Sequence, residues 1–181
     1  MDIDLICADM AHPIAGARVY ERKPDMPNIE RFASGISAWI PTYHAGHASL
    51  IALANGERWY VPKSAKSIYM ALARLHCVNL RHLRHVYEAH LRRSIYLPLV
   101  VGAQMRAYAP LKVRTPLTRN DGAMGYFRVD HVAAVRVKNR DVCFIEIHSG
   151  DVFEIQMPKL HVEQRLRDAD SLCVLMRHRG E

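Results

Sequence analysis

The fold is decided by a stretch of thirteen residues, Ile51-Ala-Leu-Ala-Asn-Gly-Glu-Arg-Trp-Tyr-Val-Pro-Lys63. Its two apolar segments flank Asn55-Gly56, which is the strongest short-range signal for a β-hairpin. From Lys63 to His76 the apolar side chains of Ile68 and Leu72 recur at helical spacing. The stretch therefore predicts strands over 48–54 and 58–61 and a helix over 63–76, with a further strand over 36–40 before them.

The same pattern returns near the end of the chain, in Ile145-Glu-Ile-His-Ser-Gly-Asp-Val-Phe-Glu-Ile-Gln-Met-Pro-Lys159. Strands are expected over 142–148 and 152–157, with a helix over 159–170. A shorter similarity links residues 79–86 with residues 128–135. The repeat predicts an α+β, mainly β fold of two tandem strand–hairpin–helix modules that share a core, although chance similarity of two such units is an alternative. The expected divisions are an N-terminal segment (1–30), a first β-rich module (31–93) and a second one (94–181).

Charge is concentrated in the middle third of the chain, although the net charge is only +7. Between Arg58 and Arg119 there are twelve Lys and Arg residues and a single acidic residue, Glu88. Cations gathered so densely repel one another, and a partner with many phosphates would neutralise them. A solvated basic face without a partner is the alternative interpretation.

Cysteine usage and hydropathy favour a soluble protein of the cytoplasm. The four cysteines are far apart, which speaks against a disulfide framework and indicates a reducing compartment. The acidic start of the chain does not resemble a signal peptide. No segment has the roughly 18 consecutive apolar residues that a membrane span needs, so no membrane association is expected.

Neither a metal site nor an enzyme is predicted. His44 and His47 have metal-ligand spacing, but no third and fourth ligands accompany them, and no metal or other cofactor is expected. The sequence has no nucleophile elbow, no phosphate-binding loop and no dinucleotide-binding glycine motif. A binding protein is therefore favoured over a catalyst.

Candidate contacts to DNA fall into two groups. The polar, turn-rich loop from Lys112 to Gly122 offers charge together with directional donors, which base edges require; its candidates for groove contact are Lys112, Arg114, Arg119 and Asn120. The candidates for phosphate contact are Lys63, Lys66, Arg81, Arg84, Arg92 and Arg93. If the loop does not set the sequence preference, the recognition element is expected within residues 79–85, so that Asn79 and His85 complete the set of candidates.

Aromatic residues mostly occupy apolar strand or helix positions, where packing in the core is expected. A platform for stacking single-stranded bases would combine exposed rings with arginine. Only Trp59 and Tyr60, beside Arg58, come close to that arrangement.

Dispersed motifs between residues 36 and 172 resemble the ComK family of bacterial competence transcription factors. They include Ser94-Ile-Tyr-Leu-Pro-Leu-Val100, Tyr108-Ala-Pro110 and Gly125-Tyr-Phe127. The segment Asn79-Leu-Arg-His-Leu83 also resembles the Asn-x-x-His element of the LytTR DNA-binding domain. The first resemblance implies an activator of DNA-uptake genes that reads A/T-rich sites through the minor groove, and the second implies loops in the major groove. The residues leave the choice of groove open.

The prediction is therefore a transcription factor that binds double-stranded DNA. We expect it to form a homo-oligomer, and RNA polymerase is a candidate partner. An RNA- or single-strand-binding module is the first alternative, and a basic module that binds an acidic protein is the second. If about six phosphates are neutralised, the logarithm of the affinity should fall with the logarithm of salt at a slope of roughly −5.

Overall fold

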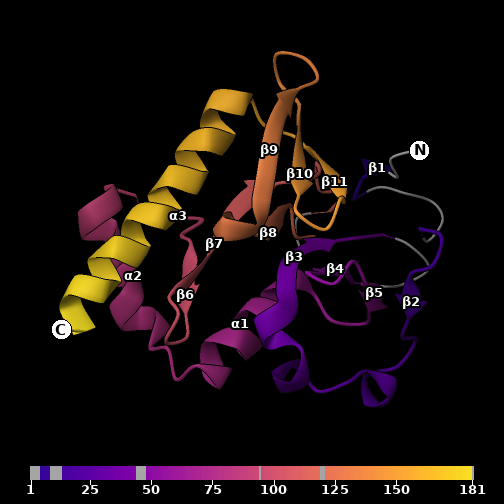
Figure 1. The fold of residues 1–181 in the computed structure, drawn as a ribbon, viewed down its shortest axis with the longest axis horizontal. Helices are drawn as coiled ribbons and strands as arrows, with labels where there is room; N and C mark the ends of the chain where they lie inside the picture. Colours follow the sequence, from indigo (N-terminus) through magenta and orange to yellow (C-terminus); the bar gives the residue numbers. More distant parts are fainter. Residues whose placement is uncertain (1–4, 9–13, 44–47, 94, 119–120, 181) are drawn as a thin grey trace.

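The computed structural model describes residues 5–8, 14–43, 48–93, 95–118 and 121–180, and its fold is α+β with mostly strands (Figure 1). The larger sheet has the strand order β2-β5-β4-β3-β8-β7-β6, and the smaller one has the order β1-β11-β10-β9. The larger sheet consists of β2 (Arg18–Val19), β5 (Arg58–Val61), β4 (Ser49–Leu53), β3 (Ile36–Pro41), β8 (Met124–Arg128), β7 (Arg106–Lys112) and β6 (Leu99–Val101). The smaller sheet consists of β1 (Leu5–Ile6), β11 (Val152–Ile155), β10 (Cys143–Ile147) and β9 (Val132–Val137). The helices are α1 (Ala65–Leu75), α2 (Leu80–Leu91) and α3 (Lys159–Gly180).

The first predicted unit forms as expected. Strands β3, β4 and β5 make an antiparallel meander in which Leu50 lies opposite Tyr60, and α1 follows at once. Gly56 adopts a φ of +84° in the turn between β4 and β5, a conformation that costs glycine little. The Asn55 side chain accepts a hydrogen bond from the Glu57 amide at 3.0 Å and so closes the turn.

The second unit repeats this order of elements. Strands β9, β10 and β11 form another antiparallel meander, which is followed by α3. The helix continues to Gly180 instead of ending near residue 170. It extends because Leu172 and Cys173 continue its buried stripe, in a cluster that also contains Leu83 and Tyr87 of α2. A burial stripe of that length favours helix well beyond the predicted end.

The larger sheet combines strands from both sides of the predicted division at 93/94. Strand β8 pairs with β3, so that Trp39 lies opposite Tyr126. Strands β6, β7 and β8 thereby extend a sheet that begins with residues of the first unit, across position 93/94 of the sequence. The N-terminal segment contributes β1 to the smaller sheet and β2 to the larger one. The division into 31–93 and 94–181 stays a prediction, and so does a LytTR-like identity for the two units.

The predicted similarity between residues 79–86 and 128–135 is wrong. The first segment is helical from Leu80, because the Asn79 side chain caps it and Leu83 and Val86 bury one side of it. The second segment leaves β8 through a 3₁₀ turn, Val129–His131, and continues as β9. The backbone of β9 pairs with β10.

The core explains why β3 and β4 are buried at every position. One face of the larger sheet presents Trp39 and Ile51 to α1, in a cluster that includes Ile68 and Leu72. The other face packs against the second meander and α3, where Phe153 and Val162 are fully buried. Strands covered on both faces read as continuous apolar runs instead of alternating ones.

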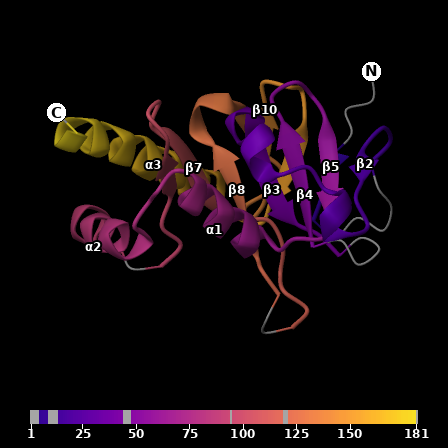
Figure 2. The same ribbon diagram turned by 90° about the horizontal axis from the view of Figure 1, so that it is seen from below.

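Helices α2 and α3 lie together at the β6 end of the larger sheet, with α2 beside the C-terminal half of α3 (Figures 1 and 2). Within the described residues, no helix is long and apolar enough to cross a membrane.

Candidate nucleic-acid interface

Helix α1 begins at an N-cap formed by the side chain of Ser64. The Ser64 hydroxyl accepts a hydrogen bond from the Ser67 amide at 3.1 Å, which satisfies one of the free donors in the first turn. Lys66 and Ser67 are exposed, while Ile68 is fully buried. The predicted phosphate contact Lys66 is therefore presented to solvent at the start of the helix, and Lys63 lies half-buried just before it.

The link between α1 and α2 is a Schellman turn in which cysteine takes the place that glycine usually holds. The Cys77 amide donates to the carbonyl of Arg74 at 3.0 Å, and the Val78 amide donates to that of Ala73 at 2.8 Å. Cys77 has a φ of +52°, the left-handed conformation this motif requires. His76 precedes it and lies near Arg106; burial and that positive charge hold the pKa of His76 below its ordinary value.

Helix α2 starts immediately after this turn. The Asn79 side chain accepts a hydrogen bond from the His82 amide at 3.1 Å. Val78 packs against the clusters on both sides of the turn, which fixes the direction in which the second helix leaves. The structure therefore holds α1 and α2 as a pair of helices joined by four residues, 76–79, whose backbone is fixed by the hydrogen bonds of the turn.

The outer face of α2 is cationic. Leu83, Val86 and Tyr87 face the core, so the opposite side of the helix is left to solvent. We call this side the α2 outer face; its exposed residues are Arg81, His82, His85, Ala89 and Arg92. In the part of the chain that the structure describes, no ion pair or hydrogen bond holds the side chains of the two arginines or the two histidines. They are free to meet an external partner.

The other predicted contacts on α2 differ in their freedom. Arg84 is 60% exposed but donates through Nε to Glu88 at 2.8 Å. Asn79 serves as the helix cap. Arg93, only 21% exposed, pairs with Asp168 of α3 at 2.9 Å, so its guanidinium ties α3 to the end of α2. The prediction that Arg93 contacts phosphate is not supported by this position.

The loop predicted to enter a groove has a different role. Arg114 is 4% exposed; its guanidinium lies 3.7 Å from the centre of the Tyr43 ring, and its Nε donates to the Gly122 carbonyl at 2.7 Å. The prediction that Arg114 contacts a DNA groove is therefore wrong, because its side chain is buried and holds the loop from inside the protein. Lys112 is half-buried at the end of β7, where its amide contacts the sulfur of Met157. Arg119 and Asn120 lie outside the described residues.

The stacking platform considered at Arg58, Trp59 and Tyr60 is also excluded. Trp59 and Tyr60 are buried in the core, and Arg58 pairs with the buried Asp151.

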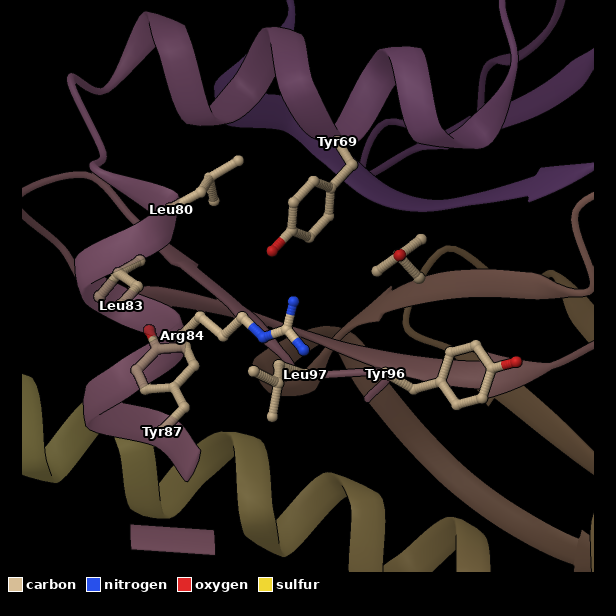
Figure 3. A pocket seen from close by; sticks show the side chains of 8 residues that line it. Tyr69, Leu80, Leu83, Arg84, Tyr87, Tyr96 and Leu97 are labelled. Carbon is tan, nitrogen blue, oxygen red and sulfur yellow. The ribbon is translucent and has the colours of Figure 1, made fainter. Parts of the chain in front are cut away.

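Exposed aromatic surface occurs elsewhere, in a groove between α1, α2 and the segment before β6 (Figure 3). Tyr69, Tyr96 and Tyr126 line it, with Leu83 and Arg84 of α2. No local pattern in the sequence indicates this site, because the three tyrosines come from distant segments that meet only after folding.

Tyr96 has an unusual backbone in this groove. Its φ is +52°, which costs a non-glycine residue about 1–2 kcal/mol. The Tyr96 carbonyl accepts a hydrogen bond from Arg165 of α3 at 2.9 Å, while the side chain remains half exposed. The hydrogen bond thus holds the backbone of Tyr96, while its ring stays accessible to solvent.

No cluster of three or more His, Cys, Asp or Glu side chains in the described residues is placed to hold a metal ion. His44 and His47 lie outside those residues. Comparison with known proteins identifies no relative, since no family model, curated protein or solved structure matches the chain. What the site can do is therefore inferred from its geometry and charge.

Proposed function

We propose that this chain binds double-stranded DNA by placing helix α2 in the major groove. The support is the combination of a rigid helix–turn–helix pair with a second helix whose outer face carries free arginines and histidines. In proteins that read DNA in this way, the second helix enters the major groove and the first contacts the backbone. The major groove is wide enough to accept an α-helix.

Charge supports the same assignment. Arg81 and Arg92 lie on the α2 outer face, and Lys66 lies exposed at the start of α1. The nearby carboxylate of Glu88 does not neutralise these cations, because it forms an ion pair with Arg84. These cations can neutralise phosphates, while His82 and His85 supply directional donors and acceptors.

A role in transcription, the activation of DNA-uptake genes and a preference for A/T-rich sites rest on the family resemblance alone. For this reason A/T-rich duplexes are the first DNA sequences to test. A homo-oligomer, with two copies of α2 about one helical turn of DNA apart, is the arrangement that dimeric proteins of this architecture use, and we propose it here on that analogy.

The test is duplex binding by variants of the α2 outer face, measured by fluorescence anisotropy with A/T-rich and G/C-rich duplexes. Arg81→Ala should weaken binding by about 1–3 kcal/mol, roughly 5- to 150-fold, if Arg81 reaches a base edge. Arg92→Ala should weaken both duplexes by similar factors if it holds a phosphate.

The matched control is Arg140→Ala, since Arg140 is exposed in the turn between β9 and β10, which lies away from α2 in both views (Figures 1 and 2). It removes the same charge and should leave the affinity within about twofold. Equal losses for Arg140→Ala and Arg81→Ala would mean that the cations act through net charge and that α2 has no special place.

A further inference from the structure

The groove lined by Tyr69, Tyr96 and Tyr126 is bordered by further hollows. A hollow of about 250 Å³ is lined by Tyr69, Arg84, Tyr96 and Tyr126. A larger one of about 630 Å³ is lined by the same four residues and by Lys66. Lys66 also borders a third hollow of about 360 Å³, which extends to Tyr43. Because neighbouring hollows share lining residues, they lie next to one another; we call the three together the tyrosine groove.

Aromatic rings on the walls are held in place. Tyr126 stacks on the buried Trp39, with ring centres 4.9 Å apart and an angle of 15° between the planes. Tyr69 packs against Tyr126 with ring centres 5.3 Å apart. Tyr96 is 50% exposed, and Figure 3 shows Arg84 extending into the space between Tyr69 and Tyr96. A planar ligand in the groove would therefore contact the packed rings of Tyr69 and Tyr126 and the exposed ring of Tyr96.

The groove offers hydrogen-bond donors in excess. In the described part of the chain, the hydroxyls of Tyr69, Tyr96 and Tyr126 have no hydrogen-bond partner, and the Lys66 ammonium has no ion pair. Burial raises the pKa of Tyr69 to about 12 and that of Tyr126 further, so both phenols stay protonated at neutral pH.

The carboxylates at the groove already accept hydrogen bonds from the protein. One oxygen of Asp121 receives hydrogen bonds from the Tyr43 hydroxyl at 2.7 Å and the Thr118 amide at 2.8 Å. Glu88 beside the groove receives Arg84. A complementary ligand must therefore bring aromatic planes, acceptor atoms and negative charge, and a nucleotide has all three.

We infer that the tyrosine groove binds unpaired nucleotides of a single strand, with a base stacked on Tyr96 and phosphates held by Lys66 and Arg84. Stacking on aromatic side chains along a cationic groove is the general means of holding single strands. A free nucleotide has the same chemistry, but the groove extends from Arg84 past Lys66 to Tyr43, which favours several linked units. The site lies beside the α2 outer face and shares Lys66 with the proposed duplex contacts, so an unpaired strand would lie next to a bound duplex.

The test is the affinity of the full chain for fluorescein-labelled oligo(dT) and oligo(U) of ten nucleotides, with dTMP and UMP as competitors. Tyr96→Ala should weaken binding of the oligonucleotides by about tenfold, whereas Tyr96→Phe keeps the ring and should retain most of the affinity. Ile95→Ala is the matched control, because Ile95 is the neighbouring residue, is 60% exposed and does not line the hollows. Thermal melting checks that each variant folds.

Two results would overturn the inference. In the first, Tyr96→Ala binds the oligonucleotides as tightly as the unaltered chain does. In the second, dTMP or UMP competes at the same concentration as the decamer, which would make the occupant a free nucleotide. Duplex affinity is measured in parallel and should not change in Tyr96→Ala, so a failure here is distinguishable from a failure of the α2 outer face.

Discussion

Arg114 and Tyr43 show how a charged residue in a polar loop can belong to the core. The Arg114 guanidinium lies over the Tyr43 ring, and the Tyr43 hydroxyl donates to Asp121. That carboxylate also receives the Thr118 amide. One ring and one carboxylate thus fix the two sides of the β7–β8 connection, which borders the tyrosine groove.

Arg114→Ala should therefore destabilise the fold. It removes a desolvated cation–π contact and a charged hydrogen bond to Gly122, for which we expect a loss of about 2 kcal/mol in the free energy of unfolding. Urea unfolding at pH 7 measures it. Duplex affinity of the folded variant should stay within about twofold, and a selective loss of sequence preference at unchanged stability would restore Arg114 as a DNA contact.

At the scale of the element, the turn between α1 and α2 decides where the outer face points. Cys77 is exposed and left-handed, a conformation in which a Cβ is unfavourable. Glycine is the residue that this position of a Schellman motif usually carries.

Cys77→Gly should accordingly raise the free energy of unfolding by about 0.5–1 kcal/mol, the strain relieved being partly offset by the greater freedom of glycine in the unfolded chain. Cys77→Val should lower it, because a β-branched residue is least compatible with positive φ. Thermal melting of both variants is the measurement. If Cys77→Gly is the less stable of the two, the turn does not carry the strain assigned to it.

The sequence predicted those elements whose signals are local. The Asn55-Gly56 turn, the matching strands and the start of α3 follow from turn chemistry and periodicity. Helix α2 was not assigned from the sequence, where residues 79–86 were compared with residues 128–135 and the helical spacing of Leu83, Val86 and Tyr87 was not used. For the candidate site, Arg81, His85 and Arg92 were predicted and are exposed. The engagement of Arg93 by Asp168, and of Arg114 by Tyr43, depends on residues more than seventy positions away and has no local signal.

On the scale of the whole molecule, folding redistributes the cations of the middle third. Asp151 and Asp168, from outside that segment, neutralise Arg58 and Arg93, and Arg114 is buried. The cations left for an external partner gather on α2 and at the start of α1. The surface is therefore more polarised, and the free cations are fewer, than the sequence indicated.

This redistribution lowers the expected salt dependence of duplex binding. If Lys63, Lys66 and Arg92 contact about three phosphates, the slope of log affinity against log salt should be about −3, shallower than the −5 expected from the sequence. Titrations between about 50 and 200 mM salt give the slope. Arg92→Ala should reduce it by about one unit, whereas a slope near zero in the unaltered chain is incompatible with phosphate binding.

The central claim is that the α1–α2 pair lies against the duplex, and Cys77 allows a direct measurement of it. Cys77 is the exposed one among the four cysteines, since Cys143 and Cys173 are buried and Cys7 is half-buried. An iron chelate attached at Cys77 in a Cys7→Ser background places a source of DNA-cleaving radicals at the turn before α2. The comparison carries the chelate in the same background with Cys77→Ser and Arg140→Cys, and strand scission of an end-labelled duplex is read on a gel. We predict efficient scission from Cys77 and little from position 140; equal scission from both, or scission only from position 140, would contradict the placement of α2 on DNA.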